Sequence, residues 1–448
     1  MRFIKNRRHL RLIYVHSRRW QRRLIFVAGG LTVGAVAVGL AMLADEAQSQ
    51  FARFTHDWPY APLLATPLGF GLTVYLTNRF FQNSQGSGIP QAIAARTLRA
   101  PRDRARLVSL RIAVGKILLT LMGLLVGAST GREGPTVQVG ASIMFALGRF
   151  SARRQPGLIL AGASAGVAAA FNTPLAGIVF GIEEMSRSFE VRASGLIIGT
   201  IIAAGLTSLA VLGDYTYFGS SASMLPIGVD WLAVPVCGVV GGLAGGGFSR
   251  ILILFGAGLP GRAGRWIKSN PVRFAILCGF GMALCGLVTG GQAFGSGYVQ
   301  AREALHNTGS LSILYAPVKL IATALSSISG LPGGIFSPSL SVGAGLGAIM
   351  TKIFPATPVG ALILLGMVSY FTGVVQAPIT GFVIVSEMTD NHGMLVPLML
   401  AALIAHASSR LICKEGVYHA LSKNFLKVTE PPSAPVAEPE TAPKPAQS

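Results

Sequence analysis

Charged residues are scarce in this chain. Only 12% of its 448 residues are Asp, Glu, Lys or Arg, whereas soluble globular proteins carry roughly 25%. The four cysteines form no CxxC pair, and the seven histidines do not cluster. The scarcity of charge argues against a soluble globular protein, and the cysteine and histidine pattern favours neither a disulfide framework nor a metal site.

Long apolar runs occupy most of the chain, in which 51% of the residues are hydrophobic. Residues 24–43 contain 20 consecutive residues without a charge, which is about the length needed to span a membrane. This run is too long for the apolar region of a secretory signal peptide, so we interpret it as a retained helix. With the later runs it predicts roughly ten crossings, although some runs are too long or too short for one straight helix. These later runs lie near 107–130, 158–182, 194–213, 231–249, 274–293, 340–351, 358–385 and 394–409.

The net charge of +20 is concentrated beside the apolar runs. Residues 1–23 contain nine Lys or Arg and no acid, directly before the first run, and a second basic cluster at 96–106 precedes the next long run. Such flanking clusters are typical of cytoplasmic loops and attract anionic lipid. This distribution favours a membrane protein with a cytoplasmic N-terminus over a nucleic-acid-binding protein.

Composition changes again near Thr429, where Pro, Ala and Glu predominate. Such a segment cannot bury a core and is predicted to be a disordered tail. We therefore divide the chain into a basic segment (1–23), a transmembrane domain (24–428) and the tail (429–448).

Three sequence segments recur in the same order. LILAGASAGVAAAFNTPLAG recurs as LILLGMVSYFTGVVQAPITG 204 residues later, GREGPTVQVGA as GIFSPSLSVGA after 203, and GSGIPQA as GSGYVQA after 209. The spacing predicts one repeat at about 66–210 and a second at about 272–412. Two repeats in a polytopic protein indicate a transporter fold, and the sequence leaves open whether they are inverted or parallel.

The two repeats differ in their acidic residues. Glu183 corresponds to Glu387, which suggests a matched structural pair. Glu133 corresponds to Phe336, and Glu184 has no acidic counterpart. Because these two carboxylates are unmatched, they are the better candidates for function.

Glycine and proline interrupt apolar surroundings in three segments: 86–90, 131–135 and 333–338. A proline shortly after glycine suits the first turn of a helix, so each segment predicts a helix that starts inside the membrane. Helix N-termini offer free N–H groups and partial positive charge, and several that converge would bind an anion without trapping it on a full charge. Ordinary kinks or re-entrant turns are the alternative. The motif residues are Gly86, Ser87, Gly88, Ile89, Pro90, Gly131, Arg132, Glu133, Gly134, Pro135, Gly334, Ile335, Phe336 and Pro338.

Glu133 lies at one of these helix starts. Its carboxylate could occupy the anion position, and protonation would release it, so one group would act as gate and proton carrier. Ionisable residues at membrane depth are usually functional; the alternative is a local ion pair with Arg132. Glu184 is either a helix-end carboxylate or a proton entry site.

Two hydroxyl residues have ordinary alternatives to a role at this site. Ser87 could donate its hydroxyl to an anion or belong to the turn. Tyr418 lies past the last apolar run, where an interfacial anchor is the usual role.

At these positions the sequence resembles the CLC family of chloride channels and transporters. GSGIP, GREGP, GGIFSP, the PLAG-to-EEM segment, the PITG-to-EMTDN segment and a terminal Tyr occur in family order across about residues 86–420. The resemblance implies an all-α polytopic membrane protein with two inverted repeats and broken helices. It also implies a homodimer with one pore per subunit.

The resemblance also assigns residues. It implies that Glu133 is the external gating glutamate and Glu184 the internal proton glutamate. The second assignment points to an antiporter, since many channels of the family lack an acid there. Gln91 departs from some bacterial members, which have Glu after GSGIP. The implied chloride-binding residues are Ser87, Gly134, Ile335, Phe336 and Tyr418.

The sequence therefore predicts chloride/proton exchange across a bacterial inner membrane, with membrane lipid around the protein and both termini cytoplasmic. It predicts no cofactor, no enzymatic activity and no nucleic-acid partner. A passive chloride channel with the same fold is the first alternative. An intramembrane hydrolase is the second, because 162–166 matches GxSxG, but that motif needs a strand–turn–helix context and the second repeat has Val368 in place of Ser164.

Overall fold

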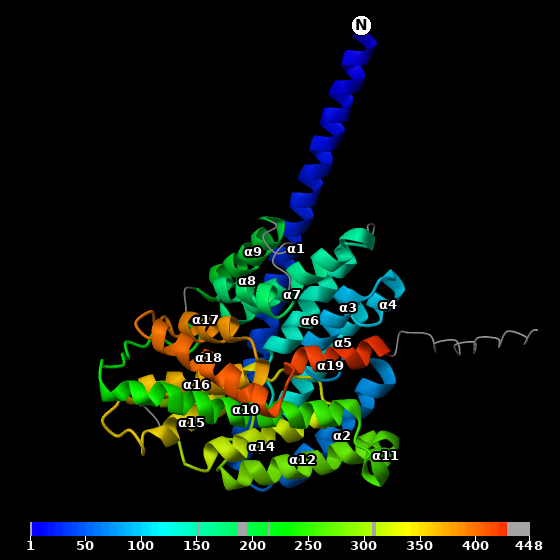
Figure 1. The fold of residues 1–448 in the computed structure, drawn as a ribbon. Coiled ribbons are helices and arrows are strands. Elements are labelled where there is room, and N and C mark those ends of the chain that lie inside the picture. The colour runs from blue at the N-terminus through cyan, green and yellow to red at the C-terminus, as the bar shows by residue number, and fades with distance from the viewer. Residues whose placement is uncertain (1, 150–151, 187–194, 214–215, 307–310, 428–448) are drawn as a thin grey trace, which may run out of the picture.

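The computed structural model describes residues 2–149, 152–186, 195–213, 216–306 and 311–427. These residues form α-helices, two short 3-10 helices (Ala152–Arg154 and Val229–Leu232) and connecting loops, and they contain no β-strand. The expected all-α class is confirmed (Figure 1). The tail expected at 429–448 lies outside the described residues.

Seven helices of the first half recur in the same order in the second half. The first set is α2 (Pro62–Phe80), α3 (Ile89–Thr97), α5 (Leu110–Leu125), α6 (Glu133–Leu147), α7 (Gln155–Phe171), α8 (Pro174–Glu183) and α9 (Gly195–Leu212). The second set is α12 (Pro271–Val288), α13 (Tyr298–Leu305), α14 (Tyr315–Ile328), α15 (Phe336–Met350), α16 (Val359–Val375), α17 (Pro378–Thr389) and α18 (Leu395–Ile412). The remaining helices are α1 (Arg2–Asp57), α4 (Pro101–Ala105), α10 (Ala233–Ala257), α11 (Gly261–Ser269) and α19 (Val417–Lys427).

The breaks between helices are repeated as closely as the helices. Asn172 ends α7 in the left-handed conformation with φ 57°, and Gln376 ends α16 with φ 60°. A proline then begins the next helix in each half, at Pro174 and Pro378. The apolar runs at 158–182 and 358–385 are therefore each two helices.

Among the described residues, six segments are long and apolar enough to cross a membrane. The other apolar runs form helices of 10–17 residues, so the roughly ten runs counted in the sequence do not correspond to ten straight crossings. The long segments are Arg23–Asp57, Pro101–Leu125, Gly195–Leu212, Val229–Ala257, Pro271–Val288 and Leu395–Ile412.

Glycine allows the central helices to pack closely. Gly140 of α6 faces Gly162 of α7, and a Cβ on either would overlap the facing backbone carbonyl. The matched pair, Gly343 of α15 and Gly366 of α16, meets in the same way. Such close backbone contact replaces the hydrophobic driving force that is missing in lipid.

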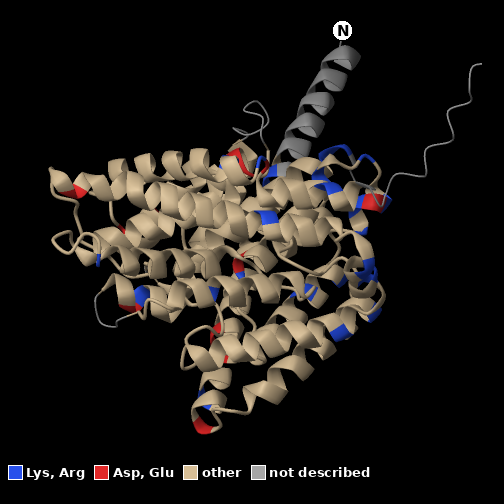
Figure 2. Ribbon diagram, turned by 60° about the horizontal axis from the view of Figure 1, so that its bottom comes forward, with Lys and Arg blue, Asp and Glu red and all other residues tan. Residues whose placement is uncertain are grey.

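Lys, Arg, Asp and Glu lie mainly at the periphery of the bundle (Figure 2). The interior is mostly apolar, with scattered buried Ser, Thr, Gln and Asn side chains, and its buried charged side chains are a small set at 104, 116, 132, 133, 184 and 319. Because charges inside an apolar bundle need partners, each of these residues is expected to have specific contacts.

Candidate anion site

The three glycine-proline turns meet at one point. Gly131 and Gly334 exchange backbone hydrogen bonds, with N···O distances of 2.8 and 2.7 Å. Gly333 N donates to Gly86 O at 2.9 Å, which ties the turn before α3 to the turn before α15. The starts of α3, α6 and α15 therefore converge. The three segments are not unrelated kinks at separate places in the bundle.

Gly134 allows this convergence. A Cβ added at Gly134 would lie 2.8 Å from Ser87 O and 3.1 Å from Gly334 Cα. Only a glycine fits between the two other turns at this position. The first-turn N–H groups of α6 and α15 have no acceptor inside their own helices, so the junction carries partial positive charge.

Glu133 is the first residue of α6, and its side chain is fully buried. Its Oε1 accepts a hydrogen bond from Ser337 Oγ at 2.6 Å. Arg132 directs its guanidinium elsewhere, to Asp45 Oδ1 at 2.5 Å and Ala41 O at 2.6 Å on α1. The local ion pair considered from the sequence is thus replaced by a contact to another helix.

A cavity of about 420 Å³, which we call the Ser87 cavity, reaches this junction. Ser87, Ile335 and Tyr418 line it. Tyr418 is fully buried at the start of α19, with its ring 5.9 Å from that of Phe336. Apart from each other, the Ser87 and Tyr418 hydroxyls have no hydrogen-bond partner among the described residues. Because Tyr418 is buried, it is not an interfacial anchor. The Ser87 and Tyr418 hydroxyls can donate hydrogen bonds beside the free N–H groups of the helix starts, and this combination suits an anion.

Glu184 is 3% exposed and follows the last residue of α8. Its Oε1 lies 3.7 Å from His419 Nε2, and its backbone oxygen lies 2.8 Å from the same ring nitrogen. His419 directly follows Tyr418. Glu184 is therefore buried and in contact with α19, the helix that carries Tyr418. A helix-end carboxylate exposed to solvent would not have these contacts.

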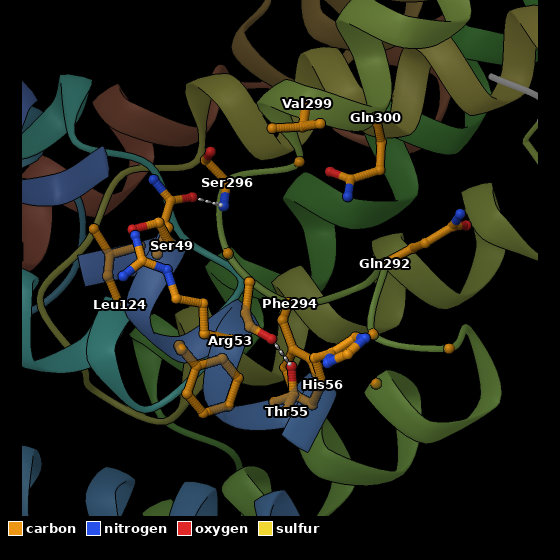
Figure 3. A pocket seen from close by; sticks show the side chains of 18 of the residues that line it. Ser49, Arg53, Thr55, His56, Leu124, Gln292, Phe294, Ser296, Val299 and Gln300 are labelled. Carbon is orange, nitrogen blue, oxygen red and sulfur yellow. Dashed lines mark hydrogen bonds between the residues drawn. The ribbon is translucent and has the colours of Figure 1, made fainter. Parts of the chain in front are cut away.

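A second cavity, of about 1130 Å³, is the repeat-related counterpart of the Ser87 cavity, and we call it the Ser296 cavity. Figure 3 shows Ser49, Arg53 and His56 of α1 on one side and Ser296, Val299 and Gln300 on the other. Each of six residues that line the first cavity has a counterpart 209 positions later that lines the second. The pairs are Asn83/Gln292, Gln85/Phe294, Gly86/Gly295, Ser87/Ser296, Pro90/Val299 and Gln91/Gln300.

Two residues that line the Ser296 cavity contact neighbours of Glu133. Asp45 lines it and pairs with Arg132, the neighbour of Glu133. Tyr298 also lines it, and its hydroxyl donates to the backbone oxygen of Tyr217 at 2.7 Å. Glu133 itself lines neither cavity, and the Ser296 cavity is connected to it through Arg132 and Tyr217.

Two fully buried lysines hold the turns at these cavities. Lys116 Nζ of α5 donates to Ser84 O at 2.8 Å and to Gly86 O at 2.5 Å. Lys319 Nζ of α14 donates at 2.8 Å to the repeat-related Ala293 O and Gly295 O. Neither lysine was predicted to belong to the site, although two lysines 203 residues apart in apolar surroundings were a visible signal in the sequence.

Two further positions bear on the alternatives. Gln91, where some family members have Glu, is buried and donates to Gln85 O at 2.6 Å, so it braces the turn before α3. Ser164 lies in the middle of α7, not at a strand–turn–helix junction. The GxSxG match therefore lacks the context that a nucleophile needs.

Comparison with known proteins defines the class. Residues 68–410 match the family model of the voltage gated chloride channel, so the chain belongs to this family, the CLC proteins, and is a multi-pass membrane protein. It is 30% identical to the H(+)/Cl(-) exchange transporter ClcA of Yersinia pseudotuberculosis serotype IB (strain PB1/+), over 92% of this chain and 89% of that one. The ClcA of Yersinia pestis bv. Antiqua (strain Angola) is also 30% identical, over 86% and 82%.

Solved structures agree on the fold. A slow cyanobacterial Cl-/H+ antiporter superposes with a TM-score of 0.77 at 25% identity, covering 91% of this chain and 99% of that one. A CLC-type fluoride/proton antiporter gives 0.75 at 23% identity over 90% and 97%. The chain thus has the CLC fold, with two inverted repeats and broken helices.

Proposed function

We propose that this protein is a secondary active transporter that exchanges chloride for protons, with Glu133 as the external gate and proton carrier. The observation that carries the proposal is the position of Glu133. A fully buried carboxylate begins α6 at the point where three helix starts meet. A carboxylate and a halide are attracted to that point by the same helix N–H groups, so they compete for it, and protonation of Glu133 ends the competition.

Chloride is held on the other side of the junction. Ser87 and Tyr418 donate their hydroxyls, and the amides of Ile335 and Phe336, with Gly134 beside them, supply the first-turn N–H groups of α15 and α6. No lysine or arginine is among these ligands, which keeps the ion exchangeable. Chloride and protons are the substrates, and the site needs no cofactor.

Glu184 is the internal proton site. The burial of its side chain and its contacts with His419, the residue after Tyr418, support this role. The relatives named H(+)/Cl(-) exchange transporter support coupled exchange over the passive channel.

The test is proton movement driven by a chloride gradient in reconstituted vesicles. Wild-type protein should acidify or alkalinise the vesicles according to the direction of the gradient. Glu133→Gln should still carry chloride and should move no protons. Proton movement that persists in Glu133→Gln would remove Glu133 from its proposed role, and chloride flux that ignores pH in the wild type would favour the channel.

The wider setting follows from the resemblance. We place the protein in a bacterial inner membrane, with both termini cytoplasmic and with one pore in each subunit of a homodimer. Exposed apolar side chains on α8 and α17, such as Leu175 and Ile379, are available for such an interface or for lipid. Cross-linking in membranes, with cysteines introduced at these two positions, would distinguish the two environments.

A further inference from the structure

Two hydroxyls, distinct from those of Ser87 and Tyr418, contact the Glu133 carboxylate. Ser337 Oγ donates to Glu133 Oε1 at 2.6 Å. Tyr217 Oη lies 3.3 Å from Ser337 Oγ and 3.5 Å from the same carboxylate oxygen. Glu133 therefore has one oxygen held by hydroxyls, while its Oε2 has no partner among the described residues.

We infer that Ser337 and Tyr217 are positioning residues that hold the Glu133 carboxylate in its charged, closed position and so set the pH at which it is released. This inference rests on the proposed gating role of Glu133. It assigns a role to a tyrosine that lies outside every sequence motif and to a serine whose repeat counterpart is Gly134.

The hydroxyl protons explain why this arrangement favours the charged carboxylate. A serine and a tyrosine each have one proton to donate. Ser337 gives its proton to Glu133, and Tyr217 can give its own to Ser337 or to Glu133. Both donations are directed towards the carboxylate, and such hydrogen bonds are strongest when the acceptor is ionised. A protonated Glu133 gains less from them, so protonation weakens the hold.

Tyr217 cannot follow the carboxylate when it moves. Its ring makes edge-to-face contacts with Phe171 and Tyr298, with centroids 5.4 and 4.7 Å away. Its backbone oxygen accepts the Tyr298 hydroxyl at 2.7 Å. Ser337 is fixed in the first turn of α15. The hydroxyl contacts therefore exist only while Glu133 occupies its present position. They stabilise this position relative to any position that the carboxylate takes after its release.

The other charged and titratable groups around Glu133 do not duplicate this role. The Arg132 guanidinium lies 5.9 Å from the centre of the Tyr217 ring and pairs with Asp45 of α1. Tyr418 of α19 lines the Ser87 cavity, and Glu184 lies near Tyr418. Among the described residues, only Ser337 and Tyr217 form hydrogen bonds with the Glu133 carboxylate.

The experiment is the pH dependence of chloride flux in proteoliposomes for Ser337→Ala and Tyr217→Phe. Loss of a donor makes the carboxylate easier to protonate, so the pH of half-maximal flux should rise, by about one pH unit for Ser337→Ala and by less for the longer Tyr217 contact. Ser337→Thr keeps the hydroxyl and should restore the wild-type profile. Unchanged profiles in both Ser337→Ala and Tyr217→Phe would overturn the inference.

A matched control lies on the same helix. Tyr315 Oη is 2.5 Å from Ser341 Oγ, one turn beyond Ser337 on α15, so Tyr315→Phe also removes a buried tyrosine–serine contact. Its pH profile should not move. In a Glu133→Gln background, Ser337→Ala should have no further effect on the profile, and a shift that persists there would show that Ser337 does not act through Glu133.

Infrared spectroscopy of the purified protein separates this inference from the proposed function. The carboxyl band that disappears in Glu133→Gln reports protonation of Glu133 without any transport. Its midpoint should move to higher pH in Ser337→Ala. If wild-type protein moved no protons but this shift occurred, exchange would be wrong and the positioning role would stand; without the shift, the positioning role is wrong.

Discussion

Glu183 and Glu387 each cap a helix that belongs to the other repeat. The carboxylate of Glu387, on α17, accepts from the N–H groups of Leu175 and Ala176 at 3.1 and 2.7 Å, at the start of α8. The carboxylate of Glu183, on α8, accepts from Ile379 and Thr380 at 3.1 and 2.6 Å, at the start of α17. The sequence predicted that Glu183 and Glu387 are a matched structural pair. Their reciprocal capping of α17 and α8 shows that they are such a pair, one from each repeat.

Removing either cap should destabilise the protein to a similar extent. Glu183→Ala and Glu387→Ala each leave two helix-terminal N–H groups without a charged acceptor, for a loss of about 1.5–3 kcal/mol. Thermal unfolding in detergent measures this loss. Glu415→Ala is the control, because Glu415 forms an exposed ion pair with Lys423, and such pairs contribute little. A large effect at only one of Glu183 and Glu387 would contradict the reciprocal arrangement.

Substitutions of the adjacent Glu183 and Glu184 should affect different properties: Glu183 the stability of the protein, and Glu184 the coupling of proton movement to chloride movement. Glu184→Gln should keep chloride flux and lose proton movement, because the amide cannot carry a proton through the site. Glu183→Gln should keep proton movement and lower the melting temperature, because it weakens the cap on α17. Proton and chloride fluxes in vesicles, with melting curves for both variants, give the answer. Full proton coupling in Glu184→Gln would remove that residue from the mechanism.

From the sequence we could predict those parts of the candidate site whose residues lie close together along the chain. The turns at 86–90, 131–135 and 333–338 carry their own glycine and proline signals, and the repeat singled out Glu133 as unmatched. Contacts between distant segments had no such signal. The Arg132–Asp45 pair joins α6 to α1, and Tyr217 reaches Glu133 from the segment after α9. Only packing of the whole bundle brings these residues together.

The hydroxyl of Tyr418 should contribute directly to chloride affinity. Tyr418→Phe removes a donor at the Ser87 cavity and keeps the ring against Phe336. Loss of a hydrogen bond to an ion should weaken chloride binding roughly 10- to 100-fold, as measured by isothermal titration calorimetry. Tyr370→Phe is the matched control, since Tyr370 is also fully buried but does not line the cavity. Equal affinities in the two variants would exclude a role for the Tyr418 hydroxyl.

The two buried lysines allow a test of which repeat binds the anion. Lys116→Met and Lys319→Met each leave carbonyl groups of one turn without their ammonium donor, so both should lower stability by about 1–3 kcal/mol. Lys116 holds Gly86, next to Ser87, whereas Lys319 holds Gly295, next to Ser296. Only Lys116→Met should therefore also weaken chloride binding, because only its turn carries a chloride ligand. Calorimetry and thermal unfolding on both variants separate the effects, and a loss of chloride affinity in Lys319→Met as large as that in Lys116→Met would place an anion ligand in the Ser296 turn as well.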